Sequence, residues 1–255
     1  MKKTLAIVLA VLLCAAMFVG CTSGTDKVAQ IKEAGKLVML TNAAFPPYEY
    51  LGSDNKPAGV DVDIAQAIAH ELDVDLEVVD MDFDGCIPAL VAGKGDLVAA
   101  GLTVTDERKE SVDFSSTYAN ATQLIIVQES NTEITSVDDL TGKTVGVQLG
   151  TTGDIYVSDL DCTVKQYKTG LEAGIDLKNG KLDAVVLDKM PAENIVSVNE
   201  GLKLLEEPFT EEYYAIAVAK GQEDFLAIVN SVVEKMYNDG TVDKLIEEHA
   251  EKAAA

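Results

Sequence analysis

Segments with the pattern of strands and helices alternate over most of this chain, and this alternation restricts its fold more than any other feature. Leu37–Leu40 and Leu76–Asp80 have the apolar pattern of strands. Between them, Ile64, Ile68 and Leu72 recur at helical spacing and predict an amphipathic helix. Each such helix has to cover a sheet, because its apolar stripe is not stable in water.

The same alternation continues to the end of the chain. Leu97–Ala100 and Ala184–Leu187 are short, continuous apolar runs, which is typical of parallel strands covered on both faces. Ser136 and Asp139 form a pattern like a capping box and predict the start of a helix before a strand at Thr144–Gln148. The fold class expected is therefore α/β, with mainly parallel sheets flanked by helices.

Two longer extended apolar runs, Thr122–Gln128 and Glu211–Val218, suggest crossings between two lobes. If the chain crosses twice, the predicted parts are a first lobe of 37–118 plus 215–255, a second lobe of 123–209, and hinges at about 119–122 and 210–214. A single doubly wound domain fits the same periodicity, so the pattern leaves both arrangements open.

The first twenty residues have the pattern of an export signal. Lys2 and Lys3 precede an apolar run from Leu5 to Gly20. As a helix this run would rise about 24 Å, which is short of the roughly 30 Å hydrocarbon core of a membrane. The alternative is an uncleaved membrane anchor. We expect residues 1–20 to be a signal peptide, which implies an exported protein.

Phe18-Val19-Gly20-Cys21 resembles a bacterial lipobox, in which the cysteine is acylated and becomes the new first residue. Phe18 departs from the leucine that is usual there. Polar residues follow, so we expect lipidation at Cys21 and a flexible tether over 21–36 that holds the protein at the cell surface or in the periplasm.

The charge and the cysteines exclude several classes of function. Acidic residues outnumber basic ones by 43 to 20, and such a chain repels nucleic acid. Cys86 and Cys162 match no metal-ligand spacing, and two buried thiols are favoured over a disulfide. Neither histidine neighbours a nucleophile. We therefore expect no metal, no cofactor and no catalytic residue.

Polar side chains follow the predicted strands at the points where ligands bind in α/β folds. Gly101 and Thr103 come after one strand, and Arg108 can offer two parallel hydrogen bonds to a carboxylate. Leu149–Gly153 follows another strand and precedes a helix, whose free backbone N–H groups favour an anion. Asp188 follows a third strand and can accept hydrogen bonds from an ammonium group.

Each of these features has an ordinary alternative. Arg108 could be a surface charge, the turn at Leu149–Gly153 could be a plain strand-to-helix turn, and Asp188 could cap a helix. Together they supply a cationic fork, a group of N–H donors and a carboxylate, which complement the charged end of an amino acid.

Longer motifs show a resemblance that covers nearly the whole chain after the leader. The motifs that carry it are Ala44–Tyr50, Gly59–Ala65, Met81–Leu90, Ala100–Arg108 and Asp113–Tyr118. In these stretches the chain resembles the bacterial extracellular solute-binding proteins of family 3, which bind polar amino acids for ABC importers. The resemblance implies a two-lobe, type II periplasmic-binding-protein-like fold with a two-strand hinge. It implies capture of a free, polar L-amino acid in the interlobe cleft, with a membrane permease and ATPase as partners and a monomer as the working state.

The resemblance also implies roles for the charged end of the ligand. Arg108 would bind the ligand carboxylate, helped by the backbone N–H groups of Thr103 and Thr152. Asp188 would accept from the ammonium group, assisted by the Gly101 carbonyl and the Thr103 hydroxyl.

Other positions would hold the ligand side chain. Phe45 and Phe83 resemble the aromatic pair that sandwiches an aliphatic stem, while Asn42 and Gln148 occupy the positions that set selectivity. Neutral Asn42 and Gln148 favour a polar or amide side chain such as that of glutamine. Arginine stays open, since Asp61 lies near the site in the family and the sequence around Gln148 resembles arginine-binding relatives; lysine and cystine stay open too.

Two other functions share the implied scaffold. Some relatives are dehydratases of cyclic, prephenate-like acids, a reaction that requires a general acid above the substrate. A sensory amino-acid receptor is the second alternative, and it would have to signal through a separate partner.

Overall fold

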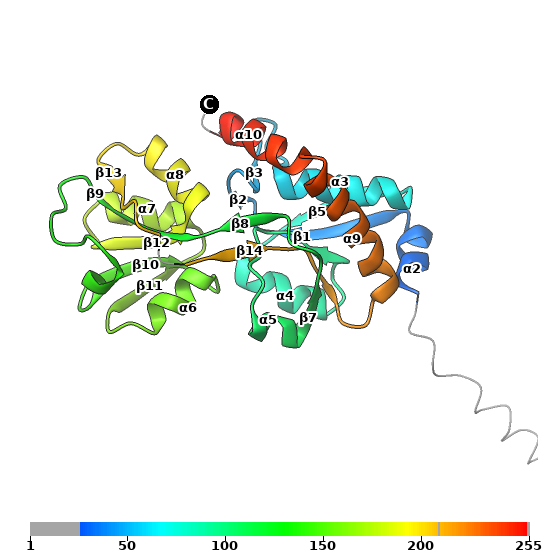
Figure 1. Ribbon diagram of the computed structural model, residues 1–255, viewed down its shortest axis with the longest axis horizontal. Coiled ribbons are helices and arrows are strands. Elements are labelled where there is room, and N and C mark those ends of the chain that lie inside the picture. The colour runs from blue at the N-terminus through cyan, green and yellow to red at the C-terminus, as the bar shows by residue number, and fades with distance from the viewer. Residues whose placement is uncertain (1–25, 209, 254–255) are drawn as a thin grey trace, which may run out of the picture.

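The computed structural model describes residues 26–208 and 210–253 of the chain. It contains two five-stranded sheets that lie side by side, each covered by helices (Figure 1). The expected signal peptide over 1–20 and the expected lipidation site Cys21 lie outside the described residues. We call the part built on the first sheet lobe 1 and the part built on the second sheet lobe 2.

The sheet of lobe 1 has the strand order β5-β1-β6-β15-β7. Its strands are β1 (Lys36–Thr41), β5 (Asp75–Asp80), β6 (Leu97–Val98), β7 (Val112–Phe114) and β15 (Ala217–Ala219). Strand β1 pairs in parallel with β5 and β6, whereas β15 runs antiparallel to β6 and β7. The small strands β2 (Ala44–Phe45), β3 (Glu49–Leu51) and β4 (Pro57–Ala58) form a separate antiparallel sheet beside it.

Helices cover both faces of this first sheet. They are α2 (Lys27–Ala34), α3 (Val60–Leu72), α4 (Phe83–Val91), α5 (Asp106–Ser111), α9 (Glu223–Asn238) and α10 (Thr241–Ala253). In α3 the apolar spacing predicted from the sequence places Ile64, Ile68 and Leu72 in the core, where the helix packs against α9 and α10. The C-terminal helices therefore complete the lobe that the N-terminal part begins.

The sheet of lobe 2 has the order β11-β10-β12-β9-β13. Its strands are β9 (Gln123–Gln128), β10 (Thr144–Gln148), β11 (Thr163–Tyr167), β12 (Ala184–Asp188) and β13 (Leu202–Leu204). Helices α6 (Thr152–Ser158), α7 (Gly170–Lys178) and α8 (Lys189–Val198) pack on it. The helix start predicted at Ser136 is confirmed as a short 3-10 turn, η1 (Val137–Leu140), with a capping box between Ser136 and Asp139.

Two crossing strands join the lobes. Strands β8 (Ala119–Ala121) and β14 (Glu212–Tyr214) pair antiparallel and form a two-stranded sheet that links the two larger sheets (Figure 1). The sequence predicted one extended run over Glu211–Val218, but the structure divides this region into β14 and β15. The reason is that the chain changes partner there, from β8 in the linking sheet to β6 and β7 in lobe 1.

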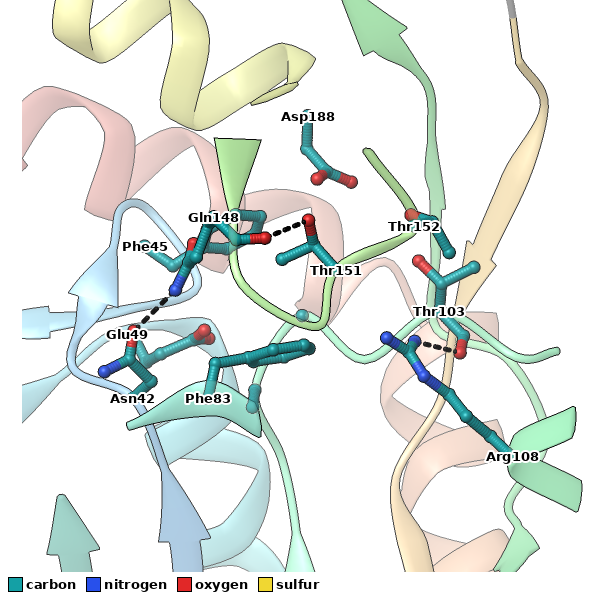
Figure 2. Close-up of a pocket in the computed structure, with 12 residues that line it drawn as sticks. Asn42, Phe45, Glu49, Phe83, Thr103, Arg108, Gln148, Thr151, Thr152 and Asp188 are labelled. Carbon is teal, nitrogen blue, oxygen red and sulfur yellow. Dashed lines mark hydrogen bonds between the residues drawn. The ribbon is translucent and has the colours of Figure 1, made fainter. Parts of the chain in front are cut away.

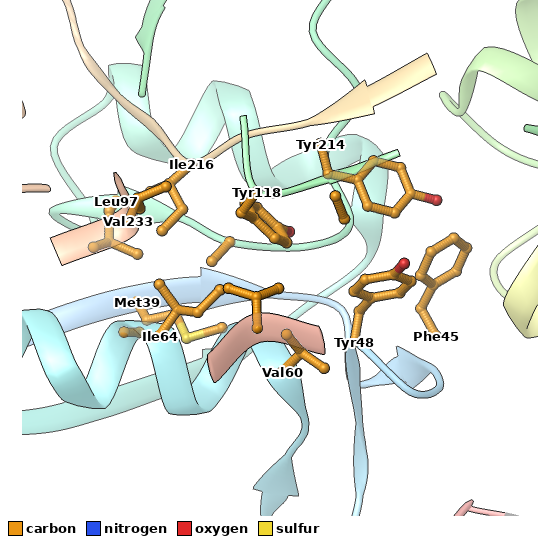
Figure 3. Close-up of a cluster of buried hydrophobic side chains, with 14 of the residues drawn as sticks. Met39, Phe45, Tyr48, Val60, Ile64, Leu97, Tyr118, Tyr214, Ile216 and Val233 are labelled. Carbon is orange, nitrogen blue, oxygen red and sulfur yellow. The ribbon is translucent and has the colours of Figure 1, made fainter. Parts of the chain in front are cut away.

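Buried aromatic rings connect the crossing strands to lobe 1. Tyr214, at the end of β14, lies edge-on to Tyr48 with ring centroids 5.0 Å apart, and Tyr118 lies 6.4 Å from Tyr214 (Figure 3). Phe45 contacts both Tyr48 and Tyr214. The apolar core of lobe 1 therefore continues directly to the crossing between the lobes.

Two expectations need correction. The flexible tether expected over 21–36 is wrong for its second half, because Lys27–Ala34 forms helix α2, capped by Asp26 and Gly35, with Ile31 buried. Mainly parallel sheets were also expected, but only part of each sheet is parallel. The strands that follow a crossing between the lobes, β9 and β15, run antiparallel to their neighbours, and β13 runs antiparallel to β9.

The cysteines of the described residues are unpaired, as predicted. Cys86 is buried in α4, whereas Cys162 is only half-buried. No helix within the described ranges has the length and apolar character needed to cross a membrane.

Candidate functional site

A small cavity lies between the two lobes, with about 10 Å³ of space open to a water molecule, so the lobes are nearly closed on it. All nine ligand-binding residues predicted from the sequence line it, together with three that were not predicted, Glu49, Ala100 and Thr151 (Figure 2). The nine are Asn42, Phe45, Phe83, Gly101, Thr103, Arg108, Gln148, Thr152 and Asp188. Both lobes contribute, so an occupant of this cavity would contact both.

Arg108 enters the cavity from helix α5. The helix begins after Thr105, whose hydroxyl caps it by accepting a hydrogen bond from the Arg108 backbone N–H. The guanidinium Nη1 donates to the Thr103 carbonyl at 2.7 Å and Nη2 to the Gly150 carbonyl at 3.0 Å. Its Cζ lies 5.5 Å from the centroid of the Phe83 ring, within range of a cation–π interaction.

The charge of Arg108 is not balanced by an ion pair. Among residues 26–208 and 210–253, none of the ion pairs within 4.0 Å includes Arg108. Burial lowers the pKa of Arg108 from its ordinary value, with the charges of Asp188 and Glu212 opposing that shift. A buried guanidinium without an adjacent anion favours the binding of an anionic group, such as a carboxylate.

The loop after β6 is held in place by hydrogen bonds to Asp61. The Gly101 backbone N–H donates to the Asp61 carboxylate at 2.8 Å, and Tyr118 donates to the other oxygen of Asp61 at 2.7 Å. Gly101 has a φ of 51°, and a Cβ at this position would lie 2.7 Å from the Phe45 ring. Asp61 thus supports the loop and does not line the cavity.

Lobe 2 presents the start of helix α6 to the cavity. Thr151 caps this helix by accepting from the Asp154 backbone N–H at 3.2 Å, while its hydroxyl donates to the Gln148 carbonyl at 2.8 Å. Thr152 is the first residue of the helix, where backbone N–H groups have no partner within the helix. This is the group of N–H donors that the sequence placed opposite Arg108.

Asp188 ends strand β12 and is 4% exposed. It occupies the N-cap position of α8, but its side chain makes no capping hydrogen bond, so the alternative of a plain helix cap is wrong. Instead its Oδ1 accepts from the Tyr214 hydroxyl at 2.6 Å. Burial and the charge of Glu212 raise the pKa of Asp188 to about 6.

Asn42 and Gln148 meet across the cavity from different lobes. The Gln148 Nε2 donates to the Asn42 Oδ1 at 2.9 Å and to the Lys168 carbonyl at 3.1 Å, while the Asn42 Nδ2 donates to the Met81 carbonyl at 2.8 Å. These bonds use both N–H groups of Gln148 and one of the two of Asn42. The Gln148 Oε1 is buried and has no hydrogen-bond partner among the described residues.

Glu49 is the most important residue that the sequence did not single out. Its side chain lies in the cavity wall at 0% exposure, next to the carboxyl group of Asp61, and no other described residue donates a hydrogen bond to it. Burial, followed by the charge of nearby Asp61, raises its pKa well above the ordinary value. The sequence signal was weak, because an acid on a short strand usually faces water.

Comparison with known proteins gives a consistent picture. Residues 37–252 match the family model described as bacterial extracellular solute-binding proteins, family 3. The L-cystine-binding protein TcyJ of Escherichia coli is 32% identical over 96% of this chain and 94% of its own length.

Two solved structures are similar along most of the chain. The amino acid ABC transporter substrate-binding protein AbpA from Streptococcus pneumoniae, bound to L-arginine, is 33% identical with a TM-score of 0.86, covering 89% of this chain and 99% of that one. An ancestral arginine-binding protein bound to glutamine is 45% identical with a TM-score of 0.80, covering 84% and 97%. Three different amino acids are thus named for these relatives, so the choice of ligand has to be argued from the cavity itself.

Proposed function

The chain belongs to the bacterial extracellular solute-binding proteins, family 3, and on this premise we propose that it captures free L-arginine between its lobes for an ABC importer. The membership confirms the family and the two-lobe α/β fold predicted from the sequence. The cavity supports an amino acid as the ligand, and its side-chain end supports arginine.

One observation carries the amino-acid assignment: Arg108 and Asp188 bring opposite charges into one cavity without forming an ion pair. Arg108, with the first backbone N–H groups of α6, suits a carboxylate. Asp188 suits an ammonium group. Among common metabolites, a free α-amino acid carries both charged groups on the same carbon atom.

The far end of the cavity supports a side chain that only donates hydrogen bonds. The buried groups there are the Glu49 carboxyl, whose oxygens both accept once it is ionised, and the Gln148 Oε1, an acceptor without a partner among the described residues. A guanidinium has five N–H donors and no acceptor, and its planar fork fits a carboxylate. Glutamine offers two donors and would add an acceptor of its own. Phe45 and Phe83 line the space between the two ends and suit the aliphatic stem.

The experiment is a thermal-shift screen of the twenty amino acids against purified protein. A ligand at about 100 times its Kd adds about 2.7 kcal/mol to the free energy of unfolding, or roughly 5–10 °C in Tm. L-Arginine should give the largest shift, and Arg108→Ala should abolish it. Lys109→Ala is the matched control, since Lys109 is exposed on the same helix. A larger shift with glutamine than with arginine would refute the assigned ligand, and no shift with any amino acid would refute the function.

The alternative of a dehydratase is disfavoured by the charges of the cavity. A cyclic, prephenate-like acid carries two carboxylates, whereas the cavity offers one guanidinium and the carboxyl groups of Glu49 and Asp188. We therefore propose a binding protein without covalent chemistry. Incubation with such an acid, followed by chromatography, should show no product. A sensory role would require a separate membrane partner and would show the same arginine binding.

We further propose how the protein is exported and attached. Residues 1–20 act as a signal peptide, and acylation of Cys21 anchors the protein outside the cytoplasmic membrane, beside the permease and ATPase. Labelling with a fatty-acid analogue should modify the wild type and spare Cys21→Ser.

The lobes are proposed to follow the bounds 37–118 plus 215–255 and 123–209, with hinges near 119–122 and 210–214, and the protein is proposed to act as a monomer.

A further inference from the structure

Glu212 is a buried acid that the proposed binding of arginine leaves without a role. It lies on β14, one of the two crossing strands, where Glu212 and Tyr214 are buried and Tyr213 between them is exposed. Its side chain is 2% exposed, and it is not among the residues that line the cavity. A carboxylate in such a place is stable only where other groups donate to it.

The donors come from both lobes. The Oε2 of Glu212 accepts from the Thr103 hydroxyl at 2.7 Å and from the Thr152 hydroxyl at 2.8 Å. Thr103 follows β6 in lobe 1, whereas Thr152 begins α6 in lobe 2. Both threonines line the cavity (Figure 2). The Oε2 of Glu212 therefore accepts a hydrogen bond from one side chain of each lobe.

The direction of these hydrogen bonds is fixed at Thr152. Its hydroxyl oxygen accepts from the Gln123 Nε2 at 3.3 Å, so its proton is free to point to Glu212. The other oxygen of Glu212, Oε1, has no hydrogen-bond partner among the residues described. The two threonine hydroxyls therefore account for the hydrogen bonds that this carboxylate receives.

The strand that carries Glu212 is bonded to lobe 1. The backbone of its strand is tied to the segment around Thr103, because the Val104 N–H donates to the Tyr213 carbonyl at 3.0 Å and the Ala215 N–H donates to the Leu102 carbonyl at 3.1 Å. No comparable backbone bond ties β14 to α6 within the described residues. Opening of the lobes would therefore break the bond to Thr152 and keep the bond to Thr103.

From this geometry we propose that Glu212 is a positioning residue that couples arginine binding to closure of the lobes. Its carboxylate bonds to Thr152 only when lobe 2 is closed, and the same bond holds the first turn of α6 where its N–H groups meet the ligand carboxylate. An interaction that exists only in the closed state shifts the equilibrium toward that state. The inference rests on the proposed function, and it adds a residue that acts without contact with the ligand.

The test is a double-mutant cycle with stopped-flow binding of L-arginine to the full exported chain. Glu212→Ala and Thr152→Val should each weaken arginine binding roughly 10-fold or more, mainly through a faster dissociation rate. The double variant should bind no more weakly than the weaker single variant, because both changes remove the same hydrogen bond. Thr152→Val keeps the backbone N–H, so any loss reports on the hydroxyl.

Conservative variants separate positioning from direct binding. Glu212→Gln keeps an acceptor oxygen and Thr152→Ser keeps a hydroxyl, so each should restore most of the affinity lost in Glu212→Ala and Thr152→Val. The matched control is Glu211→Ala, because Glu211 is the exposed neighbour and should leave binding unchanged. If Glu212→Ala does not fold, the arginine affinities of Glu212→Gln, Thr152→Val and Thr152→Ser are compared instead.

Three outcomes would overturn the proposal while leaving arginine binding established. These are wild-type affinity in Glu212→Ala, additive losses in the double variant, or a loss in Glu212→Gln as large as in Glu212→Ala. An equal loss in Glu212→Gln and Glu212→Ala would indicate that the charge of Glu212 acts directly on the ligand. Failure of the wild-type protein to bind any amino acid would instead refute the proposed function and this inference with it.

Discussion

The polar groups of the cavity differ at its two ends, and this difference determines which ligand the residues select. At one end Arg108 and the start of α6 offer donors beside the acceptor Asp188. At the other end lie the buried Glu49 carboxyl, which accepts once it is ionised, and the Gln148 Oε1, which has no partner in the described part of the chain. Buried acceptors without donors are costly, so a ligand rich in N–H groups stabilises this end most.

Glu49→Gln tests the side-chain end. The amide removes the charge that would pair with a guanidinium, so arginine affinity should fall roughly 10- to 100-fold while glutamine or citrulline binds relatively better. Isothermal titration with all three ligands measures the change. Glu71→Gln is the control, because Glu71 is exposed in the neighbouring helix α3. Unchanged arginine affinity in Glu49→Gln would remove Glu49 from the site.

Arginine affinity should also depend on pH through Asp188. With a pKa of about 6 in the empty site, this carboxyl is ionised at pH 7.5 and mostly protonated at pH 5. Its proton must leave before it can accept from the ligand ammonium, so affinity should be roughly 10-fold weaker at pH 5 than at pH 7.5. The raised pKa of Glu49 acts in the same direction. Titrations at both pH values decide this, and equal affinity would contradict it.

The residues that the sequence placed in the site share one property: they follow strand ends or belong to motifs of the family. Arg108 and Asp188 could be predicted because the ends of strands meet at one edge of each sheet. Glu49 and Glu212 could not, since nothing in their neighbours along the chain indicates that an acid will be buried. Their environment comes from residues distant in sequence, such as Asp61 for Glu49 and Thr152 for Glu212.

At the scale of elements, the turn after β6 has to fit closely against Phe45. A methyl group on Gly101 would lie 2.7 Å from the Phe45 ring, and the φ of 51° disfavours any side chain. Gly101→Ala should therefore cost stability and also reduce the thermal shift produced by arginine. Gly221→Ala is the control, because Gly221 has a φ of 75° and open space around its Cα. It should lose roughly 1 kcal/mol in stability and keep the full arginine response.

Helix and strand positions were predicted well where local patterns act alone and poorly where the chain changes partner. Thr144–Gln148 matches β10 residue for residue, because its apolar run lies between clear turn signals. The segment 27–34 was predicted as tether because short amphipathic helices are marginal by themselves, and α2 is stabilised by packing Ile31 against lobe 1. The break between β14 and β15 depends on strand partners that the local sequence does not specify.

At the scale of the whole molecule, closure requires a ligand that contacts both lobes. Without a ligand, the lobes are already joined across the cleft by hydrogen bonds that include Arg108 to Gly150 and Gln148 to Asn42. Lys168 and Asp82 add an exposed ion pair, which contributes at most about 1 kcal/mol. Agmatine is arginine without the carboxylate, so it cannot pair with Arg108 or with the start of α6. We expect arginine to reduce the radius of gyration in small-angle X-ray scattering and agmatine to leave it unchanged. Equal compaction by both would contradict closure through the carboxylate.

The last prediction concerns how the whole fold responds to acid. Asp61 and Asp188 have pKa values raised to about 6, and that of Glu49 is raised further, because they are buried. Between pH 7.5 and pH 5 the folded state takes up protons that the unfolded chain does not, so the free energy of unfolding increases as pH falls. Carboxyls with lowered pKa values act only below about pH 4, where their ordinary values lie; they are Asp113, Asp139, Asp176 and Asp239.

Arginine should reverse this response. A bound cation and ammonium group hold Glu49 and Asp188 ionised, so the liganded protein gains little from protonation while binding itself weakens. Calorimetry should show the Tm of the unliganded protein rising by roughly 5 °C from pH 7.5 to pH 5. Over the same interval the extra Tm produced by a fixed arginine concentration should shrink. A Tm of the unliganded protein that falls toward pH 5 would contradict the uptake of protons by these buried carboxyls.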